Sequence, residues 1–134
     1  MKKFGITFLI ALVVFFILGG IFGTYVFLPE FASWHEAFPD AVRETPDFVS
    51  GFLVGILQLV ACIVLFDRLA IDNLTNGAIV GIIYSTGIWL MVDLQMLSTT
   101  NIISYNYVAL DALLSALMGA IIGVVITWSL KRFA

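Results

Sequence analysis

Four long apolar stretches constrain the fold of this chain more than any other feature of the sequence. A helix needs about 20 consecutive apolar residues to cross a hydrocarbon core about 30 Å thick. Strands of a transmembrane β-barrel would instead show about ten residues of alternating polarity, which these stretches lack. The stretches cover residues 4–28, 48–66, 78–97 and 107–130. The sequence therefore predicts an all-α, integral membrane four-helix bundle, with residues 1–134 forming a single transmembrane domain.

The composition supports a membrane protein and excludes several other classes. Hydrophobic residues make up 62% of the chain and charged residues 11%, against about 45–50% and about 25% in soluble domains. These values exclude an ordinary soluble domain and a disordered chain. The net charge of −3 argues against nucleic acid as a partner. A disulfide within the chain is impossible because Cys62 is the single cysteine.

The distribution of Lys and Arg predicts the orientation in the membrane. Positive residues favour the cytoplasmic side, and short connections favour antiparallel neighbours. The first stretch is longer than a signal-peptide core and ends at Pro29, so we interpret it as an uncleaved anchor. With both termini in the cytoplasm, only Arg43 lies outside, whereas the inside holds Lys2, Lys3, Arg68, Lys131 and Arg132. We therefore expect a multi-pass protein of a bacterial inner membrane, with both termini cytoplasmic.

Residues 29–47 form the largest predicted loop, on the outer side. The loop is acidic, and Pro39 and Pro46 should break it into short pieces. Its apolar residues recur at spacings of three and four, which is typical of one helical face. We expect this amphipathic loop to lie on the outer membrane interface, with Trp34 in the aromatic belt. The predicted interfacial residues are Phe31, Trp34, His35 and Phe38, with His35 as an interfacial polar residue.

Small residues recur every four positions on each apolar stretch. Such rows allow membrane helices to approach closely, since lipid provides no hydrophobic drive between them. The third stretch carries one row, from Gly77 to Asp93, and the fourth carries another, from Asp111 to Thr127. We interpret the rows as helix contacts, within the chain or with partner proteins. The predicted helix-packing glycines are Gly19, Gly23, Gly51, Gly55, Gly77, Gly81, Gly119 and Gly123.

Two acidic residues, Asp93 and Asp111, lie inside the third and fourth stretches. At 1.5 Å per residue both fall at a similar depth in the outer part of the bilayer, and both should point away from lipid. Three interpretations stay open. The acids could fix the hairpin by hydrogen bonds, they could bind a cation, an amine-bearing lipid head or another small ligand, or they could relay protons. The candidate binding residues are Asp93, Asp111, Gln95, Trp89 and Ser115.

Motifs for other chemistry are missing from the sequence. A lone His35 cannot supply a bis-histidine haem site, and no zinc spacing or Gly-rich phosphate loop occurs. No Ser/His pair is placed for acyl transfer. We therefore expect no cofactor, no metal and no catalytic residue.

Two stretches of the chain resemble small four-helix bacterial membrane proteins. The segment from Asp93 to Thr99, followed by Asp111, is similar to the domain-of-unknown-function family numbered 2177, whose motif carries an Asp and a second Asp at the head of the next helix. The overall layout and the segment from Leu110 to Gly123 resemble the family numbered 1761. The resemblance implies that the two acids act as a unit, and it implies no activity or substrate.

Two functions are therefore expected, and they belong to different classes. The first is an interaction protein or accessory subunit of a larger membrane complex, with other membrane subunits or further copies of the chain as partners. The alternative is binding or transport of a small molecule, cation or lipid by Asp93 and Asp111 near the outer face. A membrane-embedded enzyme is the least favoured.

Overall fold

The computed structural model describes residues 2–134 and is all-helical over that range. Four continuous helical stretches are long and apolar enough to cross a membrane. The expected all-α class is thereby confirmed. The elements are α1 (Lys2–Phe22), the π-helix η1 (Gly23–Phe27), α2 (Leu28–Ala37), α3 (Phe48–Arg68), α4 (Leu74–Thr99) and α5 (Tyr105–Arg132).

The N-termini of α3, α4 and α5 are fixed by short polar side chains. The carboxylate of Asp47 accepts from the Val49 N–H, Asn73 from the Thr75 and Asn76 N–H groups, and Ser104 from the Tyr107 N–H. These bonds satisfy backbone donors that a helix N-terminus otherwise leaves free. The helices accordingly extend a few residues beyond the apolar stretches that predict them.

The first helix continues through Pro29 instead of ending at Leu28. Proline has no N–H and its ring crowds the carbonyl four residues before it, which normally kinks or ends a helix. Here the backbone widens into the π-helix η1 just before the proline, and the Leu28 N–H bonds to the Gly23 carbonyl. The predicted loop over residues 29–47 is therefore wrong in its first part, because Leu28–Ala37 is helical and continuous with α1.

Helices α4 and α5 make the closest helix contact in the chain. A Cβ placed at Gly81 would clash with the Gly119 carbonyl oxygen, and one placed at Gly123 would clash with the Gly77 carbonyl oxygen. Backbones this close are possible only where side chains are absent or very small. We call this contact the α4–α5 seam, formed by Gly77, Gly81 and Ser85 on α4 and by Gly119, Gly123 and Thr127 on α5.

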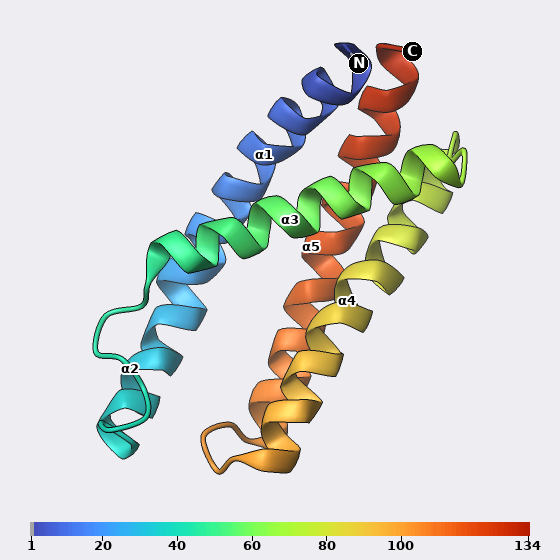
Figure 1. The fold of residues 1–134 in the computed structure, drawn as a ribbon. Coiled ribbons are helices and arrows are strands. Elements are labelled where there is room, and N and C mark those ends of the chain that lie inside the picture. Colours follow the sequence, from blue (N-terminus) through green and yellow to red (C-terminus); the bar gives the residue numbers. More distant parts are fainter. Residues whose placement is uncertain (1) are drawn as a thin grey trace.

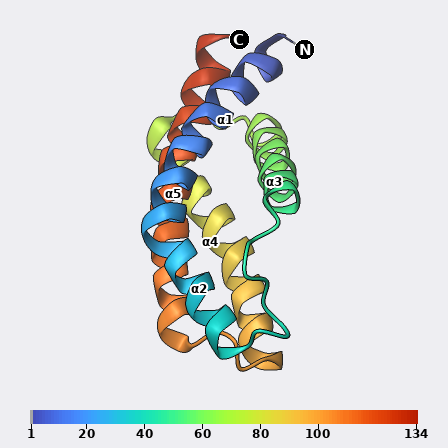
Figure 2. The same ribbon diagram turned by 90° about the vertical axis from the view of Figure 1, so that its left-hand side faces the viewer.

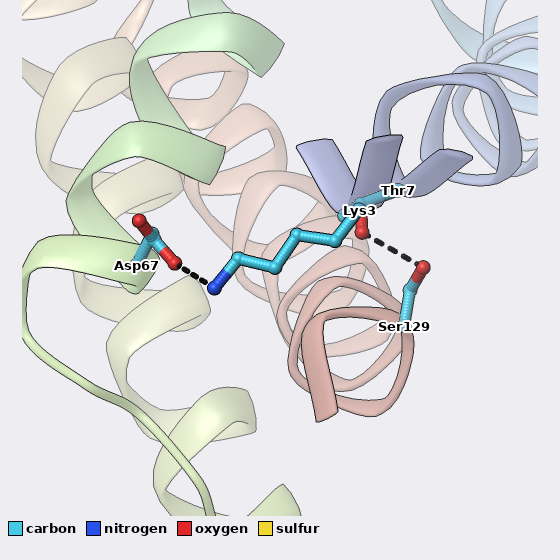
Figure 3. Close-up of polar contacts among 4 residues, drawn as sticks. All are labelled: Lys3, Thr7, Asp67 and Ser129. Carbon is cyan, nitrogen blue, oxygen red and sulfur yellow. Dashed lines mark hydrogen bonds and ion pairs between the residues drawn. The ribbon is translucent and has the colours of Figure 1, made fainter. Parts of the chain in front are cut away.

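The two chain ends lie side by side at one end of the molecule (Figure 1). There α1 and α5 are joined by a hydrogen bond of 2.9 Å between the fully buried hydroxyls of Thr7 and Ser129. Lys3 also forms an ion pair of 2.6 Å with Asp67, at the end of α3 (Figure 3). The main apolar core fills this end, and its most deeply buried members are Ala11, Ile63, Phe66 and Ile126.

Helix α3 crosses the other helices and does not run alongside them (Figure 1). Its C-terminal half is packed into the core, where Ile63 and Phe66 are fully buried. Its N-terminal half stands apart from α4 and α5 (Figure 2). Two of its side chains, Val49 and Leu57, are 70% and 69% exposed. The arrangement leaves an open side between α1, α3 and the α4–α5 seam.

Candidate functional site: an apolar cavity beside paired acids

A cavity of about 660 Å³ occupies this open side. It lies within the range of about 300–1,000 Å³ typical of small-molecule sites. One wall is formed by α1 and η1, a second by α3, and the third by α4 and α5. Many of the lining side chains are aromatic, among them Phe15, Phe16, Phe27, Phe52, Tyr84 and Trp89.

A few polar groups also line the cavity. Asp111 and Ser115 come from α5, Ser85 and Tyr84 from α4, and Gln58 from α3. The Tyr84 hydroxyl donates a hydrogen bond of 3.0 Å to the Gln58 backbone carbonyl, which ties α4 to α3 across the cavity. An apolar pocket with a small number of placed polar groups is the usual form of a ligand site.

The two predicted acids lie near each other, Asp93 on α4 and Asp111 on α5. Asp93 is 4% exposed and Asp111 is 5% exposed, and their carboxyl groups are near neighbours. Ser115 donates a long hydrogen bond of 3.5 Å to Asp111 Oδ1. Asp93 Oδ2 is buried without a hydrogen-bond partner. Asp111 lines the cavity and Asp93 lies behind it.

The acid pair has no positively charged ion-pair partner within residues 2–134. In the described part of the chain, residues 2–134, the one ion pair joins Lys3 to Asp67 and involves neither acid. Two neighbouring carboxyl groups repel each other when both are ionised, so a proton or a cation between them stabilises the pair. A buried oxygen without a partner is also costly. The geometry is therefore suited to hold a proton or to accept a positively charged or hydrogen-bond-donating group from the cavity.

Of the other predicted binding residues, Trp89 lines the cavity and Ser115 bonds to Asp111. Gln95 does not belong to the site. Two residues beyond Asp93 on a helix it faces the other side, where it is exposed. Its backbone carbonyl accepts hydrogen bonds from Ser98 and Thr99 at the end of α4. The expectation that Gln95 joins the acids is therefore wrong.

The predicted packing glycines divide into two groups. Gly77, Gly81, Gly119 and Gly123 lie in the α4–α5 seam, and a Cβ at Gly55 would lie 2.9 Å from the Phe15 ring. Gly19, Gly23 and Gly51 have open space around them and line the cavity. These three glycines are therefore not in close helix contacts of the kind seen in the α4–α5 seam. Sequence spacing alone does not separate the two groups.

The predicted interfacial residues lie at the far end from the chain termini. The ring of Trp34 packs against two other rings and is not simply exposed on the outside. Its centroid lies 4.7 Å from that of Tyr107, edge-on, and 4.9 Å from that of Phe31. His35 Nδ1 lies 2.7 Å from the Val42 carbonyl oxygen and so ties α2 to the turn that follows it. Phe38 ends α2, and its N–H bonds to the Trp34 carbonyl. These contacts give the segment a packing role as well as the predicted interfacial one.

Asp47 is the charged residue where α3 begins at the mouth of the cavity. The hydroxyl and backbone of Ser50 bond to its carboxylate, and with the Val49 N–H and the charge of Arg43 they hold the pKa of Asp47 below its usual value. The Ser50 Oγ–Asp47 Oδ2 distance is 2.5 Å. The side chain therefore stays ionised at the start of α3, where the helix dipole favours negative charge.

Two site residues were not predicted from sequence, Gln58 of α3 and Tyr84 of α4, which line the cavity and are linked by a hydrogen bond. Outside the site, the pairing of Thr7 with Ser129 across 122 positions of sequence was not predicted either. A polar residue in an apolar stretch is the one available signal, and it does not identify the partner. In residues 2–134 no group of three or more His, Cys, Asp or Glu residues is placed to hold a metal ion.

Comparison of the chain with protein-family models, with curated proteins and with solved structures gives no match. The resemblance to the families numbered 1761 and 2177 therefore stays a prediction. The candidate site is defined by its own geometry.

Proposed function

We propose that this chain is a four-pass protein of a bacterial inner membrane, with both termini in the cytoplasm. The support is the position of the chain ends, which lie together (Figure 1), and the concentration of Lys and Arg near those ends. In this orientation the acid pair and the acidic segment after α2 lie toward the outer face. The helices α1 and α2 then form one crossing and the residues that follow them form the outer connection.

Within that topology we propose that the protein binds a small amphipathic molecule in the cavity. One observation carries this proposal: a space of about 660 Å³, lined by aromatic rings, reaches the buried carboxyl group of Asp111. The apolar lining would accept the body of the ligand, and Asp111 and Ser115 would contact its polar group. Binding or transport of such a ligand is the second of the two functions expected from the sequence.

The accessory-subunit role stays a prediction. Apolar side chains on α1 and α3, such as Leu9 and Leu57, are exposed. Either lipid or a partner helix would cover them equally well. They do not favour a partner over the bilayer.

The proposal is tested by extracting the protein gently with its native lipids and weighing the intact particle by native mass spectrometry. We expect one small molecule bound per chain. Gly51→Leu should remove it, because a leucine at this open position projects into the cavity without a clash. Gly5→Leu is the matched control, since Gly5 is equally unobstructed and lies outside the cavity lining.

Two results would contradict binding in the cavity. The first is a ligand that stays bound in Gly51→Leu. The second is a particle without any ligand that contains other subunits in fixed ratio, which would support the accessory role instead.

A further inference from the structure

We propose that the ligand of the cavity is a lipophilic organic cation, with a single positive charge held at Asp111 and an apolar, preferably aromatic, body in the rest of the space. This inference rests on the proposed function and specifies its ligand class. It follows from three independent features of the site: an acid pair without a counter-ion, an aromatic lining and a negative field at the mouth.

The first feature is the missing counter-ion. Asp93 and Asp111 are each at least 95% buried. In residues 2–134 neither acid forms an ion pair, and Asp93 Oδ2 has no hydrogen-bond partner. A buried charge is normally paired. Because Asp111 faces the cavity, a cation that enters from there would complete the pair, whereas an anion would meet a like charge.

The second feature is the lining. Tyr84 and Trp89 of α4 and Tyr107 of α5 line the cavity together with Asp111, and α1 and α3 contribute phenylalanines to the lining. Aromatic faces attract cations, most strongly where water is excluded. The same rings accept an apolar body. A small hydrated metal ion would gain little from such a lining, so the organic part of the ligand is expected to supply much of the contact area.

The third feature is the field at the mouth. Asp47 lines the cavity at the start of α3. Residues 29–47 carry five acidic residues and one arginine. A surface of one sign raises the local concentration of oppositely charged ligands. The approach to the cavity therefore favours cations before any contact is made.

The test compares two probes of the same shape and opposite charge. Tetraphenylphosphonium is a cation and tetraphenylborate is its anionic counterpart. Binding of each to the full-length protein in phosphatidylcholine nanodiscs is measured against empty nanodiscs, which correct for partition into lipid. We expect the cation to bind at least roughly tenfold more tightly than the anion after this correction. This comparison uses the unaltered protein and so does not depend on the folding of a variant.

A variant then assigns the charge to the acid pair. Asp111→Asn should lower the affinity for tetraphenylphosphonium at least roughly tenfold. The affinity for tetraphenylborate should stay unchanged or increase. Asp67→Asn is the matched control, because this acid pairs with Lys3 at the end of the chain away from the cavity and should leave both affinities unchanged.

The outcomes separate the ligand class from the proposed function. If both probes bind equally and Gly51→Leu abolishes both, the cavity binds ligands but the cation preference is wrong. If neither probe binds above empty nanodiscs, and no native ligand is found, the proposed function fails with it. If phosphatidylethanolamine in the nanodisc displaces the cationic probe, the preference for a cation is supported and the natural source of the charge is a lipid amine.

Discussion

The two sides of α5 show how the same small-residue pattern leads to opposite structures. On one side, Gly119 and Gly123 meet glycines of α4 so closely that no methyl group fits. On the other side, Gly19, Gly23 and Gly51 line a cavity of about 660 Å³ and have open space around them. The difference comes from what holds each helix. Helices α4 and α5 are joined by a short turn and contact each other along their length, whereas the fully buried side chains of α3, Ile63 and Phe66, lie in its C-terminal half.

The largest expected effect comes from adding a side chain inside the α4–α5 seam, where the two backbones are in contact. Gly81→Leu should destabilise the protein by at least roughly 3 kcal/mol, because the new Cβ meets the Gly119 carbonyl and neither backbone can move away without separating the helices. Unfolding in a detergent titration, followed by circular dichroism, measures this. Gly87→Leu, on the same helix but in open space, is the control. Equal stability of the two variants would show that the seam is loose.

A smaller loss is expected at the end where the termini meet. Thr7→Val keeps the shape of the side chain but leaves the buried Ser129 hydroxyl without its partner, which should cost about 1–3 kcal/mol. The double variant with Ser129→Ala should regain part of this loss, because both polar groups are then gone. Additive losses in the same unfolding experiment would mean that the two hydroxyls do not interact.

The cavity lining should tolerate a large side chain in place of glycine, which the α4–α5 seam does not. Gly19→Leu is expected to change stability by less than about 1 kcal/mol, since nothing lies within 4 Å of the new Cβ. It should nevertheless reduce the affinity for tetraphenylphosphonium, because the side chain projects into the cavity. A strongly destabilised Gly19→Leu would indicate that the cavity is closed by another helix in the membrane.

The smallest effect concerns the start of α3. Because the folded-state pKa of Asp47 is lowered, its contribution to stability is present at pH above the ordinary Asp pKa and is lost as the pH falls through the folded value. Ser50→Ala should raise this pKa toward the ordinary one, because the largest cause of the shift is the Ser50 hydrogen bond. Carboxyl chemical shifts recorded during an acid titration measure both values. An unchanged pKa in Ser50→Ala would contradict the hydrogen bond.

The sequence predicts the elements of this fold better than their arrangement. Length and polarity are enough to place four apolar helices, because each depends on a local run of residues. The similar depth of Asp93 and Asp111 could be predicted, since their rows of small residues mirror each other, but the sequence left open whether the two acids meet. The crossing of α3 could not be predicted. It depends on how Phe66 and Ile63 pack against distant residues such as Ala11 and Ile126, and no periodicity encodes that.

The same limit explains the misplaced residues. Gln95 is adjacent to Asp93 in sequence but on another face of the helix, and the helix period predicts this once the orientation of Asp93 is known. Pro29 is a reliable helix breaker unless the backbone before it widens. That widening is a property of five residues acting together, Gly23–Phe27, and it has no established sequence signature.

The π-helix before Pro29 also has a mechanical consequence. The proline has no N–H to donate to the turn before it, and that turn contains Gly23, Thr24 and Phe27 of the cavity lining. Bending stiffness should therefore be lowest there. We expect any flexing of the α1–α2 rod to occur at this turn, so that it changes the width of the cavity mouth and leaves the α4–α5 seam undisturbed.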